Sequence, residues 1–133
     1  MEKINIFKKL KITEAQNKLV IDAPKEYADL FKDFKNIDFQ FDSNKKNGYD
    51  FVQIFATEQE ELEKLVLENA DAGKYDCYYW ACYPKGGGKI KSNIKRDTVW
   101  KAFELIKLRP VTQIAIDETW SALRARPSER VGK

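Results

Sequence analysis

Apolar and polar residues are arranged along the chain in short blocks that predict strands and helices in alternation. The block Lys18 to Asp22 (KLVID) predicts a first strand, and Pro24 suits the first position of the helix that follows. Four apolar residues then repeat at the spacing of one helical face: Tyr27, Leu30, Phe31 and Phe34. Residues 37–41 alternate between apolar and polar types as a second strand would, and residues 42–49 are rich in turn-forming types.

The middle of the chain continues this alternation. Residues 51–56 are almost continuously apolar, which is typical of a parallel strand buried on both faces. Thr57 and Glu60 have the spacing of a capping box, so they predict the start of a helix, and Gly73 is expected to end it. Residues 75–83 form an aromatic, apolar run that predicts the next strand.

The last third of the chain predicts one helix and two strands. Asp97 is the expected N-cap of a helix over residues 98–107. Residues 111–116 predict a strand, and only a short connection separates them from a second run over residues 120–126, so these two strands should form an antiparallel hairpin. Strands that alternate with helices predict a mostly parallel sheet covered on both faces. The expected fold class is therefore α/β, a three-layer Rossmann-like sheet that ends in an antiparallel hairpin.

Length and composition fit one domain. The 133 residues accommodate an N-terminal arm over 1–17, a single α/β domain over 18–127 and a C-terminal tail over 128–133. No apolar run approaches the ~20 residues that cross a bilayer, and no secretory signal is visible. We therefore expect a cytoplasmic protein without a membrane partner. Histidine, the commonest metal ligand, is absent from the sequence, and we expect no metal.

The two cysteines, Cys77 and Cys82, lie in the same predicted strand. Their separation along that strand is roughly 16 Å, and their side chains should point to opposite faces. Because a disulfide needs Cα atoms within about 7 Å, these residues are expected to be buried free thiols.

A net charge of +3 conceals an uneven distribution. Residues 1–84 hold 12 basic and 16 acidic side chains, whereas residues 85–133 hold 12 basic and 5 acidic ones. The positive half begins with a glycine-rich loop whose lysines and backbone amides are candidate anion ligands. The candidate anion-binding residues are Lys85, Gly86, Gly87, Lys89, Lys91, Ser92, Lys95 and Arg96. The loop lacks the residue spacing of a P-loop, so it does not specify a nucleoside triphosphate. The expected partner is an anion, either a nucleotide or a nucleic acid.

Three features near the predicted strand ends resemble those of a known family. The features are the Trp80-x-x-Tyr83-Pro84-Lys85 strand end, the basic loop behind it, and the run DETWSALR over residues 117–124. Together they resemble a family of small bacterial domains of unknown function with a degenerate class I methyltransferase-like fold. The resemblance covers about residues 19–126.

The resemblance implies where S-adenosylmethionine would bind in an active member. Such enzymes have a glycine-rich turn after the first strand, an acidic residue there, and a second acidic residue after the next strand. Asp22 and Asp42 stand at those two places and form a possible vestigial cofactor site. The turn has no glycine, however, and Pro24 and Tyr27 are expected to add bulk where the cofactor would lie.

The sequence favours a non-catalytic binding or regulatory domain whose basic loop contacts an anionic partner. No cofactor and no catalytic residue are expected, because the Asn-Pro-Pro-Tyr signature of amino-methylating members is missing after Ala56. Two alternatives stay open. One is an S-adenosylmethionine-dependent methyltransferase, and the other is an adaptor that binds a protein partner.

Overall fold

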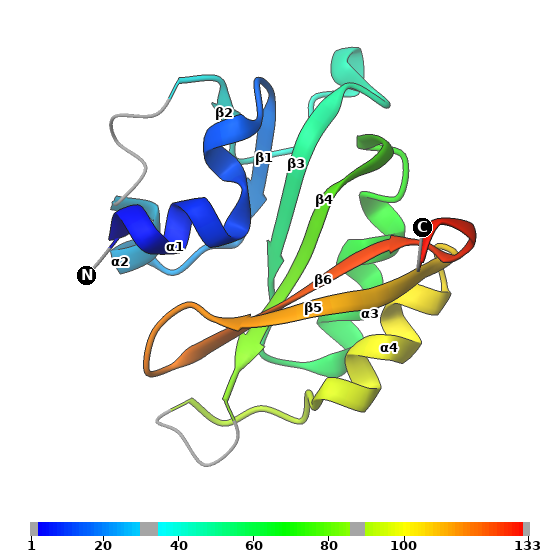
Figure 1. Ribbon diagram of the computed structural model, residues 1–133. Coiled ribbons are helices and arrows are strands. Elements are labelled where there is room, and N and C mark those ends of the chain that lie inside the picture. The colour runs from blue at the N-terminus through cyan, green and yellow to red at the C-terminus, as the bar shows by residue number, and fades with distance from the viewer. Residues whose placement is uncertain (1–2, 30–34, 86–89, 132–133) are drawn as a thin grey trace.

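A computed structural model describes residues 3–29, 35–85 and 90–131, which form one six-stranded sheet flanked by helices (Figure 1). The strands are β1 (Lys18–Ile21), β2 (Ile37–Asp38), β3 (Tyr49–Phe55), β4 (Gly73–Pro84), β5 (Leu108–Ala115) and β6 (Trp120–Pro127). The helices are α1 (Lys3–Leu10), α2 (Lys25–Ala28), α3 (Gln59–Glu68) and α4 (Arg96–Glu104), with short 3₁₀ turns η1 (Ile12–Glu14), η3 (Ser43–Lys45) and η4 (Ser128–Arg130).

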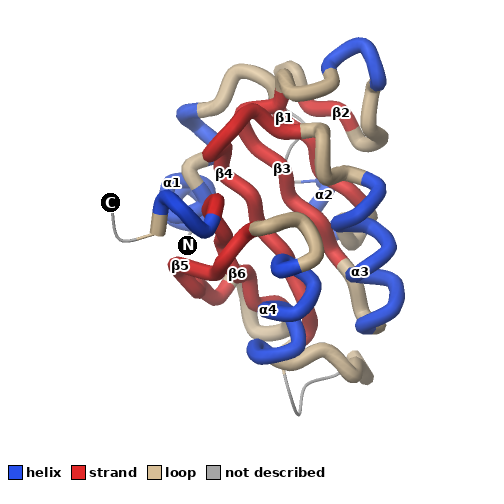
Figure 2. Tube along the Cα trace, turned by 90° about the vertical axis from the view of Figure 1, so that its right-hand side faces the viewer, coloured by secondary structure: helices blue, strands red, loops and turns tan. Residues whose placement is uncertain are grey.

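The strand order is β2-β1-β3-β4-β6-β5. The first four strands run parallel to one another, and β6 lies antiparallel between β4 and β5. Figure 2 shows α3 and α4 side by side on one face of the sheet and α1 and α2 on the other. This arrangement confirms the expected three-layer α/β fold with a terminal antiparallel hairpin.

Each face of the sheet has its own hydrophobic core. The first core lies beneath α3 and α4 and includes Val52, Ile54 and Tyr79. The second core lies beneath α1 and α2 and includes Phe51 and Trp80. Successive side chains of a strand point to opposite faces, so strands buried on both faces are continuously apolar. The cysteines follow the same rule, because Cys77 packs against the first core and Cys82 lies in the second.

The N-terminal segment packs against the sheet. Phe7, Leu10 and Ile12 are buried in the second core. The indole N–H of Trp80 donates a hydrogen bond of 3.0 Å to the backbone carbonyl of Leu10, the last residue of α1. This bond satisfies a carbonyl that the end of the helix leaves without an intrahelical partner. The limits of the domain stay a prediction.

Two helix starts differ from the expected ones because distant or neighbouring side chains supply their caps. The N-cap of α3 is Glu58 rather than Thr57, and the amide of Gln59 donates to Oδ1 of Asn93, 2.6 Å away on another loop. Helix α4, by contrast, begins before the expected residue, with Lys95 rather than Asp97 at the N-cap. A side chain that is far away in sequence cannot be recognised in a local capping pattern.

Gly73 and the second strand also differ from expectation. Gly73 begins β4 instead of ending α3. A Cβ atom at this glycine would lie closer than 3.0 Å to Sγ of Cys77, so the close approach within β4 explains the residue. Strand β2 is limited to Ile37–Asp38. The expected apolar face over residues 30–34 lies outside the described residues.

None of the helices in the part of the chain that the structure describes is long and apolar enough to cross a membrane.

Candidate cofactor site

A cavity of about 450 Å³ opens where β1 and β2 end. Its walls include Ile21 and Asp22 at the end of β1, Phe39, Gln40 and Phe41 after β2, and Leu65 of α3. In open α/β sheets, ligands bind outside the carboxyl ends of the strands. We call this space the carboxyl-end cavity.

Asp22 forms the turn at the mouth of this cavity. Its φ angle is 58°, in the left-handed region that glycine adopts most easily and that aspartate tolerates better than most residues. The turn after the first strand, which has no glycine, is therefore made by the aspartate itself. The side chain of Asp22 is exposed and lines the cavity.

Tyr27 does not fill the cavity, contrary to the expectation from the sequence. Its ring is 5% exposed and packs in the second core, with its centroid 5.0 Å from that of Phe55. Its hydroxyl lies 3.0 Å from Nε2 of the buried Gln53, which donates to it. Burial raises the pKa of Tyr27 well above its ordinary value. The cavity adjoins the opposite core, where Leu65 packs, so Tyr27 lies on the other side of the sheet.

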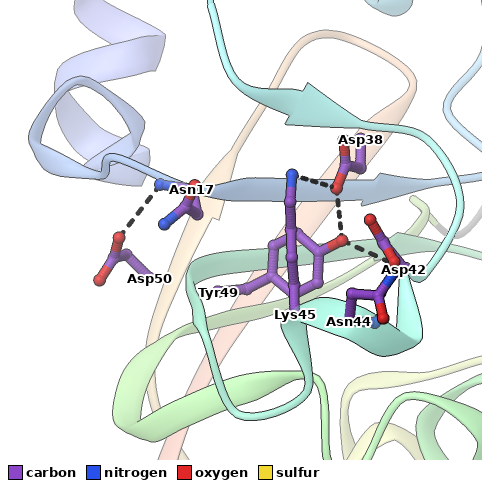
Figure 3. A network of polar contacts seen from close by, with 7 residues as sticks. All are labelled: Asn17, Asp38, Asp42, Asn44, Lys45, Tyr49 and Asp50. Carbon is purple, nitrogen blue, oxygen red and sulfur yellow. Dashed lines mark hydrogen bonds and ion pairs between the residues drawn. The ribbon is translucent and has the colours of Figure 1, made fainter.

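A polar network holds the segment between β2 and β3 (Figure 3). Asp38, the last residue of β2, accepts hydrogen bonds from the Tyr49 hydroxyl and from Nζ of Lys45, 2.9 Å away. The Tyr49 hydroxyl in turn accepts the amide N–H of Asp42 at 3.2 Å. The network ties both ends of residues 39–41, which form a wall of the cavity, to the start of β3.

These contacts perturb two pKa values in opposite directions. The hydrogen bond from Tyr49, followed by that from Lys45, lowers the pKa of Asp38. Burial, and then the hydrogen bond to Asp38, raises the pKa of Tyr49 to about 12. At neutral pH the carboxylate is therefore charged and the phenol is a hydrogen-bond donor, which is the pairing that the network requires.

Asp42 lies next to the cavity but does not line it. Its Oδ1 atom accepts the amide N–H of Asn44 at 2.9 Å and so caps the 3₁₀ turn η3. The carboxylate at the end of β2 is that of Asp38, which the sequence interpretation missed because the strand was expected to continue to Phe41. Of the two predicted acidic residues, the structure brings only Asp22 into the cavity wall.

The predicted anion-binding residues follow β4. Gly86, Gly87 and Lys89 lie outside the described residues. The amide of Lys85 donates to the carbonyl of Thr119 at 2.8 Å, which joins the end of β4 to the hairpin. The remaining candidates take structural or exposed positions: Ser92 accepts the amide of Ile94, Lys95 precedes α4, and Lys91 and Arg96 are exposed. An anion site in this loop stays a prediction.

Solved structures of other proteins share this fold. A candidate type 11 methyltransferase from Sulfolobus solfataricus aligns with a TM-score of 0.59 and 12% identity, over 97% of this chain and 81% of its own. A SAM-dependent methyltransferase from Aquifex aeolicus aligns with a TM-score of 0.53 and 17% identity, over 82% and 68%. A protein from Pyrococcus horikoshii aligns with a TM-score of 0.52 and 11% identity, over 91% and 76%. No protein-family model and no curated protein matches the sequence.

These likenesses establish a class I methyltransferase-like, Rossmann-like α/β fold. They also correct the function favoured from the sequence. The interpretation as a non-catalytic domain that contacts an anion through its basic loop is contradicted, because two of these three structures, those from Sulfolobus solfataricus and Aquifex aeolicus, carry the names of methyltransferases. Of the alternatives left open, the S-adenosylmethionine-dependent methyltransferase agrees better with these neighbours.

Proposed function

We propose that the protein is an S-adenosylmethionine-dependent methyltransferase that holds its cofactor in the carboxyl-end cavity. The observation that carries this proposal is the cavity itself. It lies at the ends of β1 and β2, on the edge where open α/β sheets bind ligands. Its wall combines two carboxylates, those of Asp22 and Glu68, with aromatic rings.

The residues in the wall fit a nucleoside-type ligand. A volume of about 450 Å³ falls within the range of roughly 300–1,000 Å³ that small-molecule sites occupy. The Asp22 carboxylate is an acceptor for hydroxyl or amino groups. Phe39 is 55% exposed and lines the same space, so its ring offers a flat apolar surface that a bound base would cover.

When bound, S-adenosylmethionine supplies an electrophilic methyl group on a positively charged sulfur. The contribution of this chain is to bind and orient the two reactants, because alignment of nucleophile and electrophile provides much of the acceleration in such a transfer. Asp22 adds negative charge beside the site, which favours a cationic ligand. The methyl acceptor would approach over the neighbouring ends of β3 and β4. Membership of the small bacterial family that the sequence resembles is part of this proposal.

The test is a calorimetric titration of the full chain with S-adenosylhomocysteine, which measures the affinity directly. We expect saturable binding by the wild type. Asp22→Asn should bind at least tenfold more weakly, because a hydrogen bond to a charged group contributes about 1.5–3 kcal/mol. Asp42→Asn is the matched control, since asparagine also caps a 3₁₀ turn and this residue is outside the cavity wall; its affinity should stay within twofold. Absence of wild-type binding at millimolar ligand would contradict the proposal.

A second measurement addresses the reaction. S-adenosylmethionine with a labelled methyl group would be incubated with the chain and a cell extract. We expect transfer of the label that depends on the wild-type chain and falls with Asp22→Asn. Equal labelling with both variants would show that the cavity does not serve the transfer.

A further inference from the structure

The opposite, amino end of the sheet holds a second cavity, of about 490 Å³. Strand β4 bulges there, because Tyr49 pairs with Gly73 whereas Phe51 pairs with Tyr78. Asp76, within the bulge, has a left-handed φ of 61°. The cavity lies between this bulge, the turn after α1 and the end of β6, where Arg124 and Arg126 line it. We call it the amino-end cavity.

The carboxylates around this cavity already have partners. Asp50 binds Nζ of Lys74 at 2.8 Å and accepts the amide of Asn17 (Figure 3), and Glu14 accepts the hydroxyl of Tyr78 at 3.1 Å. Lys11 lies 3.9 Å from Glu14. These acidic side chains are therefore balanced by nearby lysines and hydrogen-bond donors.

The arginines, by contrast, outnumber their acidic partners. Asp76 accepts two hydrogen bonds from Arg126, at 2.9 and 2.6 Å, and lies 3.6 Å from Arg130. One carboxylate thus serves two guanidinium groups. Arg124 is a third, and no ion pair joins it to a carboxylate in the described part of the chain. The charged residues that line the cavity leave an excess of one positive charge: four are basic (Lys11, Lys74, Arg124 and Arg126) and three are acidic (Glu14, Asp50 and Asp76). Arg130, beside Asp76 but outside the cavity wall, adds a further positive charge nearby.

Arg124 is held in place by an aromatic ring. Its guanidinium lies over the ring of Tyr78, 4.6 Å from the ring centroid, and the residue is half-buried. Its Nε atom is buried and has no hydrogen-bond partner among the described residues. Burial also lowers the pKa of Arg124. A buried donor on a charged group is costly when it lacks an acceptor, so an anion at this position would relieve the cost.

We propose that the amino-end cavity binds the phosphate group of a phosphorylated small molecule, with Arg124 as its main ligand. A phosphate anion has the opposite sign to the excess charge of the cavity wall. Its oxygens also accept the fork of parallel N–H groups that a guanidinium presents. This site is separate from the carboxyl-end cavity and does not depend on the function proposed for it.

The test uses inorganic phosphate as the probe, added to the ¹⁵N-labelled full chain at pH 7.5 and compared with sodium chloride at the same ionic strength. We expect saturable NMR shifts at Tyr78, Arg124 and Arg126 with phosphate alone. Arg124→Gln should weaken binding at least tenfold, and Arg124→Lys, which keeps the charge but loses the fork, by a smaller factor. Arg109→Gln is the matched control, because Arg109 lies over the Trp100 ring outside this cavity; it should bind like the wild type.

Several outcomes would overturn the site. Non-saturable shifts that chloride reproduces would show only screening of charge. Unchanged affinity in Arg124→Gln would exclude this arginine as the ligand. If the NMR spectrum of Arg124→Gln showed that this variant does not fold, the phosphate affinity of Arg124→Lys would be measured instead. Wild-type affinity in Arg124→Lys would equally refute the proposal. Competition between phosphate and S-adenosylhomocysteine would place the anion in the other cavity.

Discussion

Trp80→Phe is expected to be among the most damaging conservative substitutions in this protein. Trp80 is 1% exposed, and its indole N–H is the donor to the carbonyl of Leu10 at the end of α1. Phenylalanine retains an aromatic ring in the second core but has no N–H. The substitution therefore tests the hydrogen bond that docks α1 while most of the apolar packing of the core is kept.

The size of the effect follows from two contributions. The carbonyl of Leu10, in a fully buried residue, would lose its indole donor, at a cost of about 1–3 kcal/mol. The smaller ring would leave about 40 Å³ unfilled, which at roughly 24 cal/mol per Å³ adds about 1 kcal/mol. The expected loss is about 2–4 kcal/mol in the free energy of unfolding. For a domain of this size each kcal/mol lowers Tm by roughly 3–5 °C.

The assay is urea denaturation followed by far-UV circular dichroism, which does not depend on tryptophan emission. Trp100→Phe is the matched control: Trp100 is 37% exposed on α4 and its ring lies 5.7 Å from the Arg109 guanidinium carbon, so its loss should cost at most about 0.5–1 kcal/mol. If the two variants lost the same free energy within about 0.5 kcal/mol, the indole bond would not be what docks α1 on the sheet.

Periodicity along the chain is enough to predict the order of the layers. The continuous apolar run in β3 is readable because both faces of that strand are buried, and the hairpin is readable because its connection is short. Helix starts were less predictable. The amide of Gln59 is capped by Asn93, and a partner that is distant in sequence leaves no local signal.

The candidate site was predictable only in part. Asp22 follows a clear strand, so its place at the strand end could be expected. Tyr27 was misplaced because the sequence does not show over which face of the sheet α2 packs, and α2 packs over the second core. Asp38 was missed because β2 ends after two residues. The pairing of Asp76 with Arg126 joins residues in two strands that are far apart in sequence. It also depends on a bulge in β4 that the local sequence does not predict.

Two further predictions concern stability. Asp76→Asn should cost about 1–2 kcal/mol near neutral pH, because a half-buried, doubly bonded carboxylate is lost. The bond from Arg126 lowers the pKa of Asp76 in the folded chain. The stabilisation is thus complete above about pH 4 and lost as the pH falls through the folded-state value, so thermal melts of the two proteins should converge below pH 4. Thr98→Val removes the hydroxyl that accepts the amide of Lys95, 2.8 Å away, and should cost about 0.5–1.5 kcal/mol in urea titrations; an unchanged midpoint would show that this cap adds nothing.

The first two residues of β3 explain why the sheet tolerates an irregular β4. Tyr49 belongs to the first core and holds the segment after β2 through Asp38 (Figure 3). Asp50, by contrast, lines the amino-end cavity and binds Lys74. Neighbouring strand residues point to opposite faces, so one peptide unit supports both polar networks. A regular pairing of β4 with β3 would not provide the bulge that carries both Lys74 and Asp76. The register shift between Tyr49 and Phe51 is therefore best understood as the backbone geometry that the amino-end cavity requires.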